Sequence, residues 1–392
     1  MPAARILCTF AGGAGHADPL VPVAAAMRDA GHEVAFHGRR SGAGTAMERG
    51  FPVFVDPEEA PGDPRTIAPL EPVDRGREER LLTGFTDRIA RARATKIIRL
   101  AAAWQSDLIV CDEADFGGML AAERIGVPHA VVLINASGSF GRTEVVAPAL
   151  RRVRRDLSLD PDGVESMLRG RLTLNPFPPS FRDPRFPLPE PSASFRPEPI
   201  VASDAAVPAS IEGLSGDRPT IYVTLGTIFP AESGDLFPRL LTAIGGLEVN
   251  AVVTVGRELD PARFGPQPDR IVVERFVPQD LILPRCDLVV NHAGSGSILG
   301  AIAHGLPIVA LPLGADQPWN ADRVEALRLG VVLDAITATP DDLAAAIGAA
   351  LSDAAMRDQA AAMRGELERL PDVKATVRIL ERLADASGSG AP

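Results

Sequence analysis

The stretch that decides the fold is residues 276–330, FVPQDLILPRCDLVVNHAGSGSILGAIAHGLPIVALPLGADQPWNADRVEALRLG. Its apolar run at 287–291 has the length and the β-branched content of a buried strand. A glycine-rich turn follows at 292–297, and the apolar spacing beyond it predicts a helix. A second strand at 307–311 leads to an acid–amide pair that opens another helix. Strands that alternate with helices in this way predict a parallel α/β sheet.

The turn at 292–297 predicts a site for a phosphate or a diphosphate. A turn at a helix N-terminus presents unbonded backbone N–H groups and the positive end of the helix dipole. Its two glycines would let a ligand approach the backbone, and its two serines add hydroxyl donors. The residues expected to contact the ligand are His292, Gly294, Ser295, Gly296 and Ser297.

One βα unit later, Asp316 and Gln317 offer a carboxylate and an amide that can hold sugar hydroxyls. A helix cap is an alternative role for Asp316, and both roles could hold together. A diphosphate site followed by a hydroxyl-binding pair predicts a nucleotide-sugar pocket.

A second candidate site follows the predicted strand at 5–10. His16 comes directly after the glycine-rich turn at 11–15, at the carboxyl edge of the sheet, where ligands bind in doubly wound folds. A neutral imidazole there can act as a general base. A dinucleotide site is disfavoured because the glycines lack GxGxxG spacing and the next strand ends in basic residues at 37–40.

Asp112 closes the predicted strand at 107–111 at the same edge of the sheet. A carboxylate beside the imidazole would fix its tautomer and stabilise the imidazolium formed in reaction. Glu113 and Asp115 are close rivals for this role, although Asp115 could instead cap a helix.

Four motifs, in this order along the chain, resemble those of the family 1 nucleotide-diphospho-sugar glycosyltransferases, which have the two-domain GT-B fold. They are GHADPLVP at 15–22, VPQ at 277–279, HAGSGS at 292–297 and DQPWNA at 316–321. The motifs lie in both halves of the chain, so the resemblance covers nearly all of it. It implies two doubly wound, Rossmann-like domains that face each other across a cleft, as in bacterial antibiotic glycosyltransferases.

The resemblance also implies roles for individual residues. His16 and Asp112 would be catalytic, and an acceptor pocket would lie in the N-terminal domain near Phe85, Phe116, Phe140 and the loop at 56–76. Further donor contacts would come from Gly226, Thr227, Phe276, Val277 and Gln279.

One departure from the family pattern bears on the donor. Many enzymes that use uridine diphosphate carry an acidic residue eight positions after the motif histidine, where it binds the ribose hydroxyls. That position here is Gly300, which has no side chain to do so. The departure favours a deoxythymidine-diphosphate (dTDP) sugar. No Asp-x-Asp metal clamp lies near the predicted diphosphate site, so we expect no metal and no cofactor beyond the nucleotide-sugar co-substrate.

The linker between the domains is predicted from proline content. Residues 176–199 contain nine prolines, a density that excludes a helix or a central strand, and this places the linker around 176–216. The expected division is 1–200 for the acceptor domain, 201–216 for a linker, 217–370 for the donor domain and 371–392 for a C-terminal helix and tail. In the family resembled, that last helix crosses back to the N-terminal domain.

Composition limits the partners. A net charge of −11 and a pI near 5.2 argue against nucleic acid or an anionic membrane as the main partner. The three cysteines are far apart without metal spacing, and no signal segment opens the chain, so a cytoplasmic location is expected. A homodimer is left open.

The sequence therefore predicts an inverting, metal-independent glycosyltransferase that acts on a small hydrophobic natural-product acceptor. Two other readings stay open at this point: a nucleotide-sugar 2-epimerase of the same fold, and a non-catalytic donor-binding partner subunit. A lipid acceptor is disfavoured by the acidic charge balance.

Overall fold

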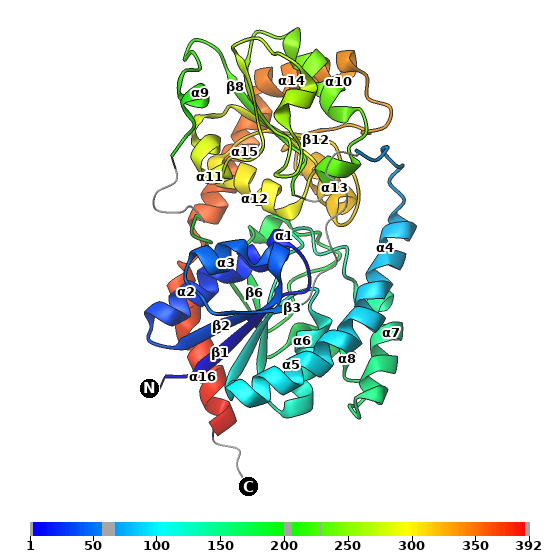
Figure 1. Cartoon of the computed structure of the whole chain (residues 1–392), viewed down its shortest axis with the longest axis vertical. Coiled ribbons are helices and arrows are strands. Elements are labelled where there is room, and N and C mark those ends of the chain that lie inside the picture. The colour runs from blue at the N-terminus through cyan, green and yellow to red at the C-terminus, as the bar shows by residue number, and fades with distance from the viewer. Residues whose placement is uncertain (1–2, 57–66, 200–205, 228, 389–392) are drawn as a thin grey trace. The chain divides into compact units, whose positions relative to one another are not determined.

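The structure is a computed structural model that describes residues 3–56, 67–199, 206–227 and 229–388. The chain divides into two compact units (Figure 1). Unit 1 comprises Met1–Glu59, Gly76–Ile200 and Arg369–Pro392, and unit 2 comprises Ala60–Arg75 and Val201–Glu368.

Unit 1 is built on a seven-stranded parallel sheet in the order β3-β2-β1-β4-β5-β6-β7. Its strands are β1 (Arg5–Thr9), β2 (Glu33–Arg39), β3 (Val53–Asp56), β4 (Leu108–Asp112), β5 (His129–Val132), β6 (Leu172–Asn175) and β7 (Ser192–Ser194). Strands β1 and β4 are neighbours, with Thr9 opposite Cys111, so the chain segments that follow them leave the sheet side by side.

Helices cover both faces of this sheet, because alternate strand residues point to opposite faces and nearly all are apolar. One face packs on α2 and α16, and the other on α5, α6, α7 and α8. The helices of unit 1 are α1 (Ala14–Ala17), α2 (Val21–Asp29), α3 (Gly44–Glu48), α4 (Arg75–Gly84), α5 (Ala90–Trp104), α6 (Phe116–Ile125), α7 (Thr143–Asp156), α8 (Val164–Arg169) and α16 (Val377–Gly388).

Unit 2 repeats the architecture with a six-stranded parallel sheet in the order β10-β9-β8-β11-β12-β13. Its strands are β8 (Thr220–Thr224), β9 (Asn250–Thr254), β10 (Ile271–Glu274), β11 (Leu288–Asn291), β12 (Ile308–Ala310) and β13 (Gly330–Val332). Its helices are α9 (Ala209–Glu212), α10 (Leu236–Gly245), α11 (Gln279–Ile282), α12 (Ser295–His304), α13 (Gln317–Ala326), α14 (Pro340–Ser352) and α15 (Ala354–Glu368). The prediction of two parallel α/β sheets is confirmed.

Two predicted elements differ from the structure. A single helix predicted near 78–103 is α4 and α5 joined by a π-helical turn, Phe85–Ile89. The linker predicted at 176–216 is wrong for its first part. Phe181 and Phe195 are buried in unit 1 within this segment, and β7 pairs with β6 at the edge of the sheet. The prolines prevent longer helices or strands from forming in this segment. The three residues of β7 contain no proline, and a strand at the edge of a sheet tolerates prolines next to it.

The described part of the segment after residue 205 begins unit 2. Ile211 of α9 is buried there, and residues 201–205 lie outside the described residues. At the other end of the chain, α16 belongs to unit 1, with Leu380 and Ala384 buried in the core beside α2.

Candidate active site

His16 lies in the short helix α1, just beyond the carboxyl end of β1. Its ring lies over Gly12, where an added Cβ would sit only 2.2 Å from the ring atom Cδ2. A side chain at position 12 would therefore push the imidazole away. The His16 side chain is 23% exposed, so part of the ring can reach a ligand.

Asp112, the last residue of β4, is fully buried and faces His16. Its Oδ2 accepts a hydrogen bond from the backbone N–H of Ala11 at 2.7 Å, and its Oδ1 accepts one from Ala114 at 2.6 Å. The same Oδ2 lies 3.3 Å from Nδ1 of His16. Two backbone amides thus fix the carboxylate where it can hold the Nδ1 proton of a neutral imidazole, which leaves Nε2 as the acceptor nitrogen.

The first rival, Asp115, has a structural role. It is the N-cap of α6, and its Oδ1 accepts from Gly118 N at 3.2 Å. Its two oxygens also receive Nε and Nη2 of Arg93, each at 2.8 Å. Burial alone would raise the pKa of Asp115, but the Arg93 guanidinium and its hydrogen bonds hold that pKa below its usual range.

The second rival, Glu113, turns away to the next strand. Its Oε2 accepts hydrogen bonds from the backbone N–H groups of Ile134 and Asn135, both at 3.0 Å. Burial raises the pKa of the Glu113 carboxyl. Glu113 therefore holds the loop that follows β5. His37 of β2 lies 3.6 Å from Asp56 and is buried as well.

Arg182 is a polar residue of this region that the sequence did not single out. Its guanidinium lies against Gly138, which has φ +70° and where a Cβ would sit 2.3 Å from Cζ. Nε donates to the carbonyl of Phe186 at 2.5 Å. Burial lowers the pKa of Arg182, and the charge of Glu113 opposes that shift. Because Arg182 falls in the proline-rich segment predicted as a linker, no local pattern indicated it.

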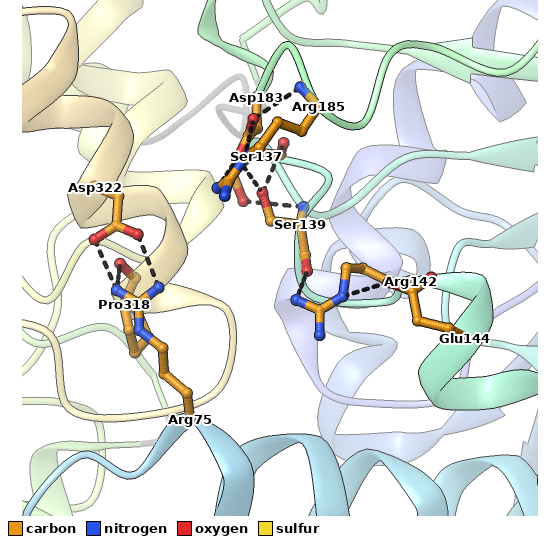
Figure 2. A network of polar contacts seen from close by, with 9 residues as sticks. All are labelled: Arg75, Ser137, Ser139, Arg142, Glu144, Asp183, Arg185, Pro318 and Asp322. Atoms are coloured by element: carbon orange, nitrogen blue, oxygen red, sulfur yellow. Dashed lines mark hydrogen bonds and ion pairs between the residues drawn. The ribbon is translucent and has the colours of Figure 1, made fainter.

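The loop after β5 is fixed by a polar cluster that Figure 2 shows from close by. Asp183 donates its backbone N–H to the carbonyl of Ser137 at 2.9 Å and accepts from Ser139 Oγ at 3.2 Å. Its carboxylate also pairs with Arg185, which holds the pKa of Asp183 at about 2. The segment predicted as a linker thus supports the carboxyl edge of the sheet in unit 1.

The three phenylalanines expected at the acceptor lie around one apolar cluster. Phe116 begins α6 and is 3% exposed, whereas Phe85 and Phe140 are partly buried against the same cluster. Their contact with an acceptor stays a prediction. The described part of the loop expected beside them, 67–75, packs within unit 2 instead, and 57–66 lie outside the described residues.

In unit 2, His292 follows β11 and is wedged between two glycines. A Cβ added at Gly226, with φ +78°, would lie 2.5 Å from Nε2, and one added at Gly294 would lie 2.4 Å from it. Burial lowers the pKa of His292 to about 4, so the ring is neutral at neutral pH. The explanation of Gly294 changes accordingly, because its missing side chain makes room for the imidazole. Gly296 does leave open space, since a Cβ there meets nothing within 4 Å.

The N-terminus of α12 has the geometry expected of an anion site. Gly294 is the N-cap, no side chain caps the helix, and the first backbone bond runs from Ile298 to Gly294. The N–H groups of the first turn, Ser295 to Ser297, have no intrahelical acceptor because of helix geometry. They can therefore point to a phosphate.

Asn320 joins this turn to the helix that begins at Gln317. It is fully buried, and its Nδ2 donates to the carbonyl of Ala293 at 2.9 Å and to Oδ2 of Asp316 at 2.8 Å. Ser295 Oγ donates to the same Asp316 oxygen at 2.6 Å. The network supports Ala293, which has the unfavourable φ of +61°. The motif DQPWNA contains Asn320, four residues after Asp316 and thus on one face of α13, but its linking role was missed.

Asp316 is at the N-cap of α13, yet its side chain makes no capping hydrogen bond. Gln317 is anchored by its Oε1, which accepts from the N–H groups of Leu313 and Gly314 at 2.7 and 3.1 Å. Its Nε2 has no protein acceptor within the described part of the chain, so this amide can donate to a ligand hydroxyl.

The remaining predicted donor residues follow β8 and β10. Thr227 is exposed after Gly226, and Phe276 is 41% exposed. The Arg257 guanidinium, which the sequence did not indicate, lies 3.6 Å from the centre of the Phe276 ring. Val277 is buried, and Gln279 begins α11.

The position of Gln279 also accounts for the absence of a side chain at Gly300. A Cβ added at Gly300 would lie 2.8 Å from Oε1 of Gln279. The amide of Gln279 therefore occupies space that a side chain at 300 would need.

None of the helices within residues 3–56, 67–199, 206–227 and 229–388 is long and apolar enough to cross a membrane. Over the same described ranges, no group of three or more His, Cys, Asp or Glu side chains is arranged to hold a metal ion.

Known proteins resemble the chain along almost its whole length. The family described as "Erythromycin biosynthesis protein CIII-like, C-terminal domain" matches residues 238–383. L-demethylnoviosyl transferase of Streptomyces niveus is 30% identical and covers 87% of both chains. 4'-demethylrebeccamycin synthase of Lentzea aerocolonigenes is 28% identical over 97% of this chain and 99% of its own.

The solved structure of the glycosyltransferase VinC in complex with dTDP has the same fold. Its TM-score is 0.75 at 22% identity, and the match covers 97% of this chain and 100% of that chain. The two parallel sheets, their motif-bearing loops and these relatives lead to one conclusion: the chain belongs to the antibiotic and natural-product glycosyltransferases, enzymes with the GT-B fold.

Proposed function

We propose that this enzyme moves a sugar from a dTDP donor to a hydroxyl group of a small hydrophobic natural-product aglycone, with inversion at the anomeric carbon. The observation that carries the proposal is the pair at the carboxyl edge of unit 1. His16 Nδ1 lies 3.3 Å from a buried Asp112 carboxylate that two backbone amides hold in place. This arrangement is that of a general base with a positioning carboxylate.

The proposed reaction is a single displacement. His16 Nε2 takes the proton of the acceptor hydroxyl as the hydroxyl oxygen attacks the anomeric carbon. The bond between that carbon and the diphosphate oxygen breaks, and the nucleoside diphosphate leaves with the electron pair. Asp112 stabilises the imidazolium that forms, without itself taking the proton.

The donor would be held by unit 2. The N–H groups at the start of α12 would receive the diphosphate and stabilise its developing charge without a metal. Because His292 is neutral, it would contact the phosphate by hydrogen bonding and not as a cation. The free amide nitrogen of Gln317 would hold a sugar hydroxyl, and the exposed ring of Phe276 would stack on the base.

The choice of dTDP is supported by Gly300, which leaves no acidic group for a ribose 2′-hydroxyl, and by the fold shared with VinC, whose structure contains dTDP. A natural-product acceptor is supported by relatives such as tylactone mycaminosyltransferase of Streptomyces fradiae. The half-buried rings of Phe85 and Phe140 are the apolar groups we assign to its pocket, with the more deeply buried Phe116 behind them.

The test is product formation from dTDP-sugars and a panel of polyketide and aromatic aglycones. We expect release of dTDP that depends on the aglycone, and a product whose anomeric proton coupling shows inversion. Activity should persist in a chelator. Retention of configuration, or consumption of the donor without any acceptor, would contradict the proposal.

A further inference from the structure

Residues 67–75 belong to unit 2 although they lie between β3 and α4, two elements built mainly from unit 1. We refer to residues 67–75 as the strap. The N–H of Ala68 donates to the carbonyl of Ala231 at 2.7 Å, and the N–H of Gly234 donates to the carbonyl of Ala68 at 3.0 Å. Gly234 has φ +51°, and a Cβ there would lie 2.9 Å from the N atom of Leu70. The first half of the strap is therefore closely fitted to the loop after β8.

The second half of the strap is fixed by Arg75 (Figure 2). Its Nη1 and Nη2 donate to both oxygens of Asp322, at 2.8 and 2.7 Å. Nη2 also donates to the carbonyl of Pro318 at 3.1 Å, and the guanidinium lies 5.2 Å from the centre of the buried Trp319 ring. Arg75 thus holds the first two turns of α13 through three different groups.

The two attachment points flank the predicted donor site. Strands β8, β11 and β12 are neighbours in the sheet, so the β11 loop with His292 lies between the loop after β8 and the start of α13. The strap binds the loop after β8 at Ala231. It binds the start of α13 at Pro318, which directly follows Gln317.

We propose that Arg75 is a positioning residue for the sugar of the donor, acting through the first turn of α13. This inference rests on the proposed function. Gln317 can present its amide to a sugar hydroxyl only if the start of α13 stays in place, and Arg75 binds the residues that immediately follow it. The diphosphate, in contrast, is assigned to the N-terminus of α12, which Arg75 does not contact itself and which α13 supports through Asp316 and Asn320. Loss of Arg75 should therefore weaken recognition of the sugar more than recognition of the nucleotide.

The experiment compares dTDP with an intact dTDP-hexose in Arg75→Ala, Arg75→Lys and Asp322→Asn. Calorimetry should give an affinity for dTDP within about 2-fold of wild type in all three. The KM for the dTDP-hexose should rise about 5-fold to 20-fold in Arg75→Ala, the combined scale of a half-exposed bidentate ion pair, a hydrogen bond to Pro318 and a cation–π contact with Trp319, and less in Arg75→Lys. The double variant of Arg75→Ala and Asp322→Asn should be no worse than Arg75→Ala alone, because Asp322 is expected to act through Arg75.

The matched control is Arg218→Ala, which removes another surface ion pair of unit 2, with Glu248 at 3.5 Å. Arg218→Ala should change neither the affinity for dTDP nor the KM for the dTDP-hexose. Equal weakening of dTDP and dTDP-hexose would overturn the inference, as would an unchanged KM. Melting temperatures identify a variant that has lost its fold, and Arg75→Lys then provides the test. If wild type binds no nucleoside diphosphate at all, the proposed function fails first, and this inference fails with it.

Discussion

The two units place a histidine at corresponding points, just beyond the carboxyl end of a central parallel strand, yet the two side chains differ in almost every physical respect. His16 is 23% exposed and lies 3.3 Å from a buried carboxylate. His292 is 8% exposed, and burial accounts for the lowered pKa of its ring. Its neighbours are the backbones of Gly226 and Gly294.

This difference shows that environment, and not residue type, assigns the chemistry. A carboxylate beside an imidazole favours its protonated form, which a general base needs as it takes a proton. Burial favours the neutral form, and it lowers the pKa of His292 to about 4. Unit 1 therefore contains the candidate base, and unit 2 contains a neutral hydrogen-bonding ring.

The largest expected effect comes from removing the base. His16→Ala should lower turnover by about 10²-fold to 10⁴-fold, the usual contribution of a positioned general base, and should leave dTDP affinity unchanged. Asp112→Asn should act in the same direction but less completely, because it keeps the shape and removes the charge. Single-turnover rates and calorimetry measure the two quantities.

The control for this prediction is the double variant. Its loss should be close to that of His16→Ala alone, since Asp112 acts only through the histidine. Turnover of His16→Ala within a few-fold of wild type would refute the assignment. Because Asp115 is paired with Arg93 and Glu113 with two backbone amides, neither rival would be an obvious replacement.

The second prediction concerns the glycine that accommodates His292. Gly294→Val should displace the imidazole, because the new Cβ would lie 2.4 Å from Nε2, and donor affinity should fall by at least about tenfold. Gly294→Ala should act in the same direction. In a His292→Ala background, Gly294→Ala should cost little further affinity.

Gly296→Ala is the matched control on the same helix, since its Cβ meets open space. It should leave the fold intact and report only how closely the ligand approaches the backbone. If Gly294→Ala is equally harmful with and without the imidazole, the glycine serves the ligand directly, as the sequence alone indicated.

The third prediction is a dependence of stability on pH that His292 should produce. Its pKa is about 4 in the folded protein and 6.5 in the unfolded chain, so between these values the unfolded chain binds a proton that the folded one does not. Stability should therefore fall as pH decreases from 6.5 to 4, by about 2 kcal/mol at pH 5 from this residue. Urea unfolding of wild type and His292→Gln at pH 7 and pH 5 measures it. Between pH 7 and pH 5, His292→Gln should lose about 2 kcal/mol less stability than wild type. Equal losses in the two proteins would show that the His292 ring is not held neutral by burial.

Much of the fold and of the site followed from local patterns. Apolar runs marked the strands and therefore their carboxyl ends, where His16, Asp112 and His292 are found, and glycine-rich turns marked two of these ends, those at His16 and His292. In a parallel sheet these ends share one edge, so sequence could place residues on the edge without knowing their contacts.

What the sequence could not show depends on contacts between residues far apart in the chain. Arg75 and Asp322 are separated by 247 residues, and nothing in the loop at 67–75 indicates its partner. Proline density correctly excluded long elements at 176–199 but could not show that Arg182 and Asp183 return to support the loop after β5. Whether Gly294 faces a ligand or a histidine likewise depends on the packing around it.

The smallest expected effect sharpens the comparison within α12, eight residues after His292. Gly300→Glu would add a carboxylate at this position. The new Cβ would lie 2.8 Å from Oε1 of Gln279, whose flexible amide can move aside. If this position faces the ribose, the variant should prefer uridine diphosphate over its 2′-deoxy form by about 3-fold to 10-fold, roughly one hydrogen bond, whereas wild type should bind both alike. The two ligands differ only in the 2′-hydroxyl, so calorimetry isolates that contact from the base.

Gly300→Ala, which adds volume without an acceptor, should weaken both ligands equally. The same equal weakening in Gly300→Glu would show that residue 300 does not face the ribose, and Gly300 would then no longer support the proposed preference for dTDP.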